Sequence, residues 1–221
     1  MPGYCTRQIT HTVGGVEYRL RVLADTQQYA DPDGHALRLG ISSAQWSLFG
    51  QCWPAGRLLA QAMDRFDITG KRILELGCGI GLASLVLQRR GADIIASDLH
   101  PLTEPFLSYN AALNALPAVH YRQLCWDRML PALGRFDAII ASDVLYERGQ
   151  AERLCTVVTQ HAMPSAEVWM VDPGRGHASR FGRLLAQEGF VSDDVACPLD
   201  DDDPPPFLGR IRRYCRTAGA H

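Results

Sequence analysis

The sequence lacks the features that mark membrane-spanning and secreted proteins. No window approaches the roughly 18 unbroken apolar residues that a membrane-spanning helix needs. Residues Met1–Cys5 show no charged segment followed by an apolar one, as a secretory signal would. We therefore expect a cytoplasmic protein without a membrane partner.

Cysteine pairs and long basic runs are missing as well. The seven cysteines are scattered without a Cys-x-x-Cys pair, and their odd number is typical of reduced thiols, which argues against a zinc site. The formal net charge is -2, and no basic run exceeds two residues before Arg210–Arg213. A protein that binds nucleic acid by bulk electrostatics would be more basic. The sequence thus favours a protein with neither a metal site nor a nucleic-acid partner.

The apolar content is sufficient for one sizeable core. The chain has 221 residues, of which 47% are hydrophobic, and this predicts a single domain with a terminal elaboration. From residue 72 onward, short apolar runs alternate with segments of helical period, which is typical of a parallel sheet covered by helices. We therefore expect an α/β fold with a doubly wound, mostly parallel sheet. The predicted strands are 72–76, 93–98, 119–125, 136–142 and 167–172, and the predicted helices are 82–90, 103–115, 150–162 and 178–188.

The two ends of the chain depart from this alternation. Residues 191–198 and 209–216 predict two strands with no room for a helix between them, and hence a closing antiparallel hairpin. The connecting segment Asp200–Pro206 fits a solvated loop or an acidic patch for a partner. At the other end, residues 1–55 predict a β-hairpin and a lid segment that are not independent of the main domain, residues 56–221.

A glycine-rich turn follows the predicted strand 72–76. Gly77, Gly79 and Gly81 are spaced two apart and lead into a predicted helix, so the backbone can approach a ligand closely and the helix offers free N–H groups. No Gly-Lys-Ser or Gly-Lys-Thr follows, which excludes a phosphate loop, and the third glycine comes one residue too early for a dinucleotide fingerprint. The alternative interpretation is a purely structural turn between strand and helix.

Two carboxylates accompany this turn. Glu75 lies at the strand end, where a carboxylate is costly unless it binds turn amides or a cationic group of a ligand. Asp98 ends the next predicted strand, where a carboxylate can accept hydrogen bonds from the two hydroxyls of a ribose. Together with the turn, they indicate a site for an adenosine that carries an ammonium-bearing tail and no phosphate.

This pattern resembles the first two motifs of the class I S-adenosylmethionine-dependent methyltransferases. The resemblance rests on Glu75–Gly81 followed by Asp98, and the antiparallel end of the predicted sheet fits the seven-stranded, Rossmann-like fold of that family. It implies S-adenosylmethionine as the cofactor and S-adenosylhomocysteine as the product. The residues that the resemblance assigns to cofactor binding near this turn are Glu75, Gly77, Cys78, Gly79, Gly81, Asp98 and Leu99.

The sequence around two tryptophans resembles motifs of a narrower branch, the seven-strand protein lysine methyltransferases. Members of this branch include enzymes acting on electron transfer flavoprotein. Trp53, just before a helical segment, resembles the tryptophan motif of that branch, which implies a cation–π contact with the sulfonium of the cofactor. Trp126 stands where the branch has an Asp-Trp pair beside the adenine, although Cys125 replaces the acid here and Asp127 follows. Core packing is the alternative for both tryptophans.

The end of the predicted strand 136–142 resembles the part of the branch that faces the target amine. Asp143 and Tyr146 match its Asp-x-x-Tyr pattern, which implies catalytic roles, and Ser142 precedes them as a cofactor-binding residue. We assign Asp143 to positioning of the incoming ammonium, because a nearby carboxylate favours the charged form and opposes deprotonation. Desolvation against Tyr146 and the tryptophans favours the reactive free amine. The structural alternative is that Asp143 only caps the next helix.

The sequence therefore predicts an S-adenosylmethionine-dependent N-methyltransferase that acts on a lysine side chain of a protein substrate, as a monomer or weak dimer. One alternative is methylation of a small-molecule amine or a nicotinamide-like ring, and a lesser one is a cofactor-binding partner protein without catalytic activity. Arg175, on the same rim, could meet an acidic substrate surface or only Asp172. We interpret His100, Asn110 and Asn114 as structural residues.

Overall fold

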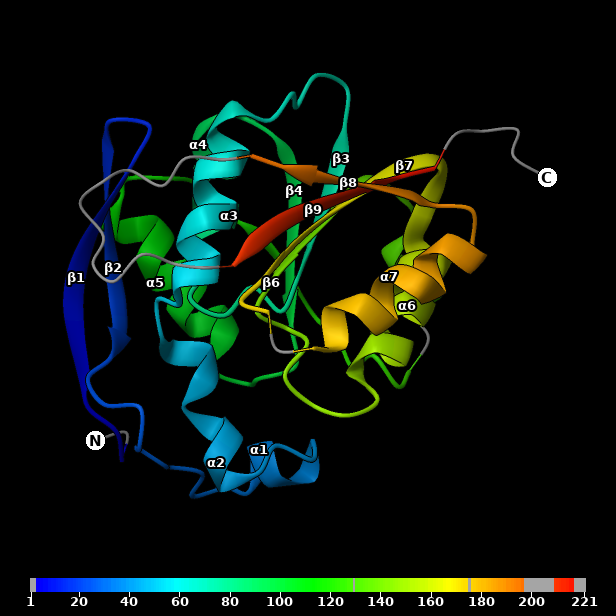
Figure 1. The fold of residues 1–221 in the computed structure, drawn as a ribbon. Coiled ribbons are helices and arrows are strands. Elements are labelled where there is room, and N and C mark those ends of the chain that lie inside the picture. The colour runs from blue at the N-terminus through cyan, green and yellow to red at the C-terminus, as the bar shows by residue number, and fades with distance from the viewer. Residues whose placement is uncertain (1–2, 129, 175, 197–208, 217–221) are drawn as a thin grey trace.

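The chain folds around one large sheet and carries a small second sheet (Figure 1). The computed structural model describes residues 3–128, 130–174, 176–196 and 209–216. The seven-stranded sheet has the order β5-β4-β3-β6-β7-β9-β8, and the two-stranded sheet consists of β1 and β2. Strands β3 to β7 pair in parallel, whereas β9 is antiparallel to both of its neighbours, β7 and β8. The predicted fold class is confirmed.

The strands of the large sheet lie close to their predicted positions. β7 begins five residues earlier than predicted, since Ala162 already pairs with Phe136 ahead of a register shift. The sequence did not indicate this extension, because residues 163–165 are exposed and show no apolar pattern. β5 is shorter than predicted, and the closing hairpin is present as β8 and β9. The loop Asp200–Pro206 and Arg175 lie outside the described residues. The bounds are β3 Arg72–Leu76, β4 Asp93–Asp98, β5 His120–Gln123, β6 Phe136–Ser142, β7 Ala162–Asp172, β8 Val191–Val195 and β9 Arg210–Cys215.

Helices cover both faces of this sheet (Figure 1). Alternate residues of β3 reach the two faces: Ile73 packs in the core shared with α3, α4 and α5, whereas Leu74 and Leu76 pack in the core shared with α6 and α7. Burial on both faces explains why the strands read as continuous apolar runs. In the part of the chain that the structure describes, no helix is long and apolar enough to cross a membrane. The bounds are α3 Pro54–Arg65, α4 Leu82–Arg89, α5 Thr103–Leu113, α6 Gln150–His161 and α7 His177–Gln187.

The amino-terminal strands β1 (Thr6–Val13) and β2 (Val16–Leu23) form a hairpin that packs beside α5 (Figure 1). Its turn residues Gly14 and Gly15 both have positive φ, 57° and 78°, as a tight two-residue hairpin turn requires. Buried side chains of β2, among them Leu20, belong to the same core as those of α3 and α4. The non-independence of residues 1–55 stays a prediction, and this shared core supports it.

Between the hairpin and α3, the chain forms three short helical turns: α1 His35–Arg38, α2 Ser43–Trp46 and η1 Leu48–Gly50. The segment is held by Trp46, which is buried and packs edge-on against Phe49. α2 begins with a reciprocal capping box between Ser42 and Gln45, which satisfies backbone N–H groups at its start. We refer to residues 35–53 as the lid segment.

Candidate active site

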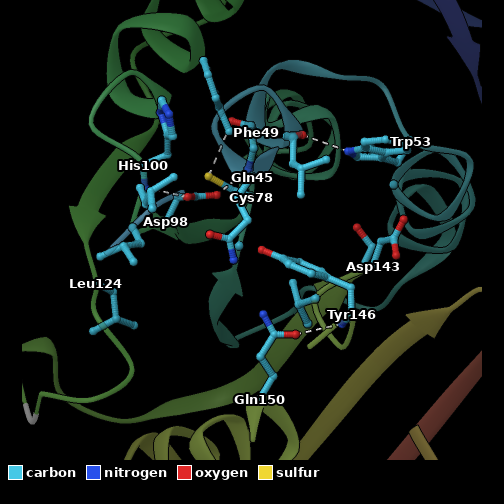
Figure 2. A pocket seen from close by; sticks show the side chains of 18 of the residues that line it. Gln45, Phe49, Trp53, Cys78, Asp98, His100, Leu124, Asp143, Tyr146 and Gln150 are labelled. Carbon is cyan, nitrogen blue, oxygen red and sulfur yellow. Dashed lines mark hydrogen bonds between the residues drawn. The ribbon is translucent and has the colours of Figure 1, made fainter. Parts of the chain in front are cut away.

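A cavity of about 400 Å³ opens at the carboxyl ends of β3, β4 and β6 (Figure 2). The lid segment, from Leu39 to Trp53, supplies the wall opposite these strand ends. The chain runs from β3 to β4 on one side and later to β6 on the other, so the cavity lies at the switch point of the sheet. Open α/β sheets bind ligands at this point, and the volume suits a small-molecule ligand.

The structure brings nearly all of the predicted site residues to this one cavity. Gly81 does not line it, because it caps α4 with a φ of 82° and packs against Leu107 of α5. Figure 2 shows Asp98 on one side and Trp53 and Asp143 on the opposite side, with the Tyr146 ring reaching in between. The predicted residues that line the cavity are Trp53, Glu75, Gly77, Cys78, Gly79, Asp98, Leu99, Trp126, Ser142, Asp143 and Tyr146.

The glycine turn has little space on either side. Gly79 has a φ of 53°, and a Cβ atom there would lie 2.8 Å from the carbonyl oxygen of Phe49 in η1. Its N–H donates to Oδ2 of Asp98 at 3.0 Å, while the N–H of Cys78 donates to the Ser97 carbonyl at 2.9 Å. The lid segment and the end of β4 therefore hold the turn from two sides, and only glycine fits between them without strain.

The two carboxylates beside the turn have different partners. Asp98 binds the turn amide of Gly79 and also accepts a hydrogen bond from the N–H of His100 at 2.9 Å. Glu75 is 3% exposed and accepts a hydrogen bond from the Ser84 hydroxyl of α4. Burial raises the pKa of Asp98, and it raises the pKa of Glu75 from its usual 4.5 to about 7. A cationic ligand group beside Glu75 would offset this cost of burial.

Asp143 and Tyr146 form the opposite side of the cavity. Asp143 follows β6 with a φ of 54°, and its N–H donates to the Val171 carbonyl at 2.9 Å. Its interpretation as a helix cap is wrong, since α6 begins at Gln150 with Gly149 at the N-cap. The left-handed backbone is uncommon for a residue other than glycine, and Asp is among the few that tolerate it.

Trp53 lies on the same side of the cavity as Asp143 in Figure 2 and is fixed by its own hydrogen bond. Its Nε1 donates to the Leu48 carbonyl at 2.9 Å, so the lid segment sets the orientation of the indole ring. Trp126 also lines the cavity next to Cys125, and Asp127 pairs with Arg153 at 3.3 Å. The acid after Trp126 is therefore engaged by an arginine.

His100 contributes more to the site than the sequence indicated. Its ring stacks on Phe49 with centroids 3.8 Å apart, and burial lowers its pKa to about 3, so the imidazole is neutral. Its Nε2 is buried without a hydrogen-bond partner among the described residues, and the residue lines the cavity. No sequence pattern pointed to this role, because the stacking partner lies far away in the chain.

These residues fit S-adenosylmethionine. Glu75 could receive an ammonium group, and Asp98 could accept hydrogen bonds from ribose hydroxyls. Trp53 lines the same cavity and offers an aromatic face to a sulfonium.

Comparison with known proteins agrees with this geometry. A sequence model of the family described as lysine methyltransferase matches residues 32–181. The histone-arginine methyltransferase METTL23 of Xenopus laevis is 30% identical over 172 residues, which cover 74% of this chain and 73% of that protein. The electron transfer flavoprotein beta subunit lysine methyltransferase of Mus musculus is 27% identical over 165 residues, or 71% of this chain and 58% of that protein.

A solved structure shares the fold. The T. thermophilus 16S rRNA N2 G1207 methyltransferase RsmC, in complex with AdoMet and guanosine, superimposes with a TM-score of 0.63 at 17% identity. The superimposed region covers 96% of this chain and 50% of the RsmC chain. Five of the curated relatives are matched over only 34% to 66% of their own length.

The family match spans more than half of the chain. It confirms the predicted family and, at the level of that family, S-adenosylmethionine as the methyl donor. The chain belongs to the lysine methyltransferase family of class I S-adenosylmethionine-dependent methyltransferases.

Proposed function

We propose that the protein transfers a methyl group from S-adenosylmethionine to the side-chain amine of a lysine in a protein substrate. The observation that carries this proposal is that one cavity holds Asp143 on the side opposite Asp98, with Tyr146 between them. One side suits the cofactor and the other suits an amine. The family match and the mouse relative, a lysine methyltransferase by name, support the same assignment.

The reaction needs alignment more than it needs a reactive side chain. When bound, S-adenosylmethionine supplies a methyl group that is already activated by the sulfonium charge. Asp143 attracts and orients the incoming ammonium, and contact with Tyr146 and Trp53 removes its hydration and thereby favours the neutral amine. The proton is released to water, and the amine nitrogen then takes the methyl group as the C–S bond to the sulfonium breaks and S-adenosylhomocysteine leaves. Asp143 is a positioning group in this scheme, because its negative charge opposes loss of the proton.

A labelling experiment tests the proposal. The purified enzyme with radiolabelled S-adenosylmethionine is given either a protein extract or a metabolite extract from a strain without the gene, and labelled residues are identified by mass spectrometry. We expect label on lysines of proteins. Label confined to metabolites would favour a small-molecule amine, label on arginine would favour the activity named for METTL23, and no label at all would favour a protein that only binds the cofactor.

The chain itself gives little background in this experiment. Lys71 is its one lysine, and it lies at the amino end of β3, opposite the cavity. Its Nζ is held by Glu167 at 2.8 Å and stands over the Phe66 ring. We therefore expect no label on the enzyme, and a Lys71→Arg variant serves as the matched control.

A further inference from the structure

A second carboxylate of the cavity follows Tyr146 directly in the chain. Glu147 lines the cavity and is half-buried, and its side-chain Oε1 accepts a hydrogen bond from Nε2 of Gln45. Gln45 belongs to α2 of the lid segment, whereas Glu147 belongs to the loop between β6 and α6. The contact therefore joins the two walls of the cavity.

The side chain of Gln45 and the backbone of Glu147 are each held by a further hydrogen bond. Oε1 of Gln45 accepts from the N–H of Ser42 at 2.8 Å in the capping box of α2, which directs Nε2 toward Glu147. On the other wall, Oε1 of Gln150 accepts from the N–H groups of Tyr146 and Glu147 at 2.8 and 2.7 Å. Gln150, the first residue of α6, therefore fixes the backbone of Tyr146 and Glu147.

Glu147 is a carboxylate, but its hydrogen-bond partner, the amide of Gln45, is neutral. Among the described residues, no lysine or arginine pairs with it, and Arg153, which also lines the cavity, is engaged by Asp127. One hydrogen bond from an amide leaves most of the acceptor capacity of a carboxylate unused. The hydrogen bond from Gln45 is charged on the carboxylate side only, and a cationic donor would add the attraction between opposite charges, so a cationic side chain would displace the amide.

We propose that Glu147 determines acceptor specificity by binding a second positive charge, a lysine or arginine side chain next to the methylated lysine of the protein substrate. Gln45 holds the carboxylate in place until that cation arrives. The assignment rests on the proposed function, and it adds that the target lysine lies in a basic stretch. Asp143 and Glu147, on either side of Tyr146, then receive two neighbouring cations.

Binding of short peptides tests this assignment. The peptides carry one central lysine flanked by arginine, alanine or glutamate, and their dissociation constants are measured by calorimetry with saturating S-adenosylhomocysteine. We expect the wild type to bind the arginine-flanked peptide about tenfold more tightly than the alanine-flanked one, with the glutamate-flanked peptide weakest. The preference should shrink at high salt, since part of it is electrostatic.

Three variants locate the source of the preference. Glu147→Gln keeps the shape of the side chain and should abolish the preference while S-adenosylhomocysteine still binds normally. Glu17→Gln removes the same charge from the exposed face of β2, outside the cavity lining, and should leave the preference intact. Gln45→Ala should also retain it, because the carboxylate is kept.

The assignment fails if the wild type shows no preference for basic flanks or binds none of the peptides, and this holds whether or not Glu147→Gln folds. It also fails if Glu147→Gln binds S-adenosylhomocysteine normally and retains the preference. Lysine labelling of proteins by the wild type without any such preference would overturn the role of Glu147 alone. Absence of lysine labelling would overturn the proposed function itself.

Discussion

The side-chain amide of Asn110 on α5 donates a hydrogen bond to the backbone carbonyl of Ile80, at 3.0 Å, within the glycine turn. Its Oδ1 accepts from the N–H of Arg21 at 2.7 Å on the open edge of β2. One turn of helix later, Asn114 accepts from the N–H of Arg19 at 2.9 Å and donates to the Arg19 carbonyl at 2.7 Å. The two asparagines thus close the edge of the hairpin, and Asn110 alone joins it to the cofactor side of the cavity.

We expect Asn110→Ala to lower the free energy of unfolding by about 1–3 kcal/mol, because it leaves buried backbone groups unpaired. It should also weaken cofactor binding, since the Ile80 carbonyl loses its donor. Asn114→Ala is the matched control: it should cost similar stability and leave cofactor affinity unchanged. Chemical denaturation and calorimetric titration measure the two effects. Equal losses of affinity in both variants would show that hairpin docking, rather than the bond to Ile80, supports the turn.

Gly79→Ala should weaken cofactor binding by about tenfold or more, because the new Cβ would meet the Phe49 carbonyl at 2.8 Å and displace either the turn or the lid segment. Gly70→Ala is a suitable control, since Gly70 has a similar φ of 65° but nothing within 4 Å of a Cβ. The control should lose about 1 kcal/mol of stability from its left-handed backbone and bind the cofactor normally. Equal cofactor affinity of the two variants in calorimetry would contradict the crowding argument.

The sequence predicted the elements whose pattern is local. The strands 72–76, 93–98 and 136–142 have the predicted bounds, because burial on both faces gives uninterrupted apolar runs. The glycine turn and the acids beside it were recognised for the same reason, since each follows directly from its strand.

Contacts between distant segments could not be predicted in this way. The capping box of Ser42 and Gln45 is a local pattern, but nothing local shows that Gln45 meets Glu147. The stacking of His100 on Phe49 and the roles of the two asparagines on α5 also depend on how the lid segment and hairpin pack. Such pairings are fixed by tertiary packing, which a single sequence does not display.

Asp143→Asn removes the charge with little backbone strain, because asparagine tolerates the left-handed region that the φ of 54° requires. We expect kcat/KM for the methylated protein to fall by about 100-fold or more, as for other groups that align reactants. Cofactor affinity should stay normal, since Asp143 lies across the cavity from Asp98. Tyr146→Phe provides a comparison that keeps the ring and removes only the hydroxyl. A loss of turnover that tracks an equal loss of cofactor affinity would place Asp143 on the cofactor side instead.

The buried Glu75 should make the stability of the cofactor-free protein depend on pH. Its pKa is raised from 4.5 to about 7 in the folded state, so the folded protein keeps a proton that the unfolded chain releases. Its contribution is therefore fully present below pH 4.5 and is lost as the pH rises through about 7, a change on the order of 3 kcal/mol. Thermal unfolding between about pH 5 and pH 8 should show this decline. The decline should be reduced in Glu75→Gln but not abolished, because burial raises the pKa of Asp98 in the same direction.

Saturating S-adenosylmethionine should flatten the decline in the wild type, since an ammonium beside Glu75 favours the ionised carboxylate. An unchanged pH dependence with the cofactor bound would show that the ammonium lies elsewhere.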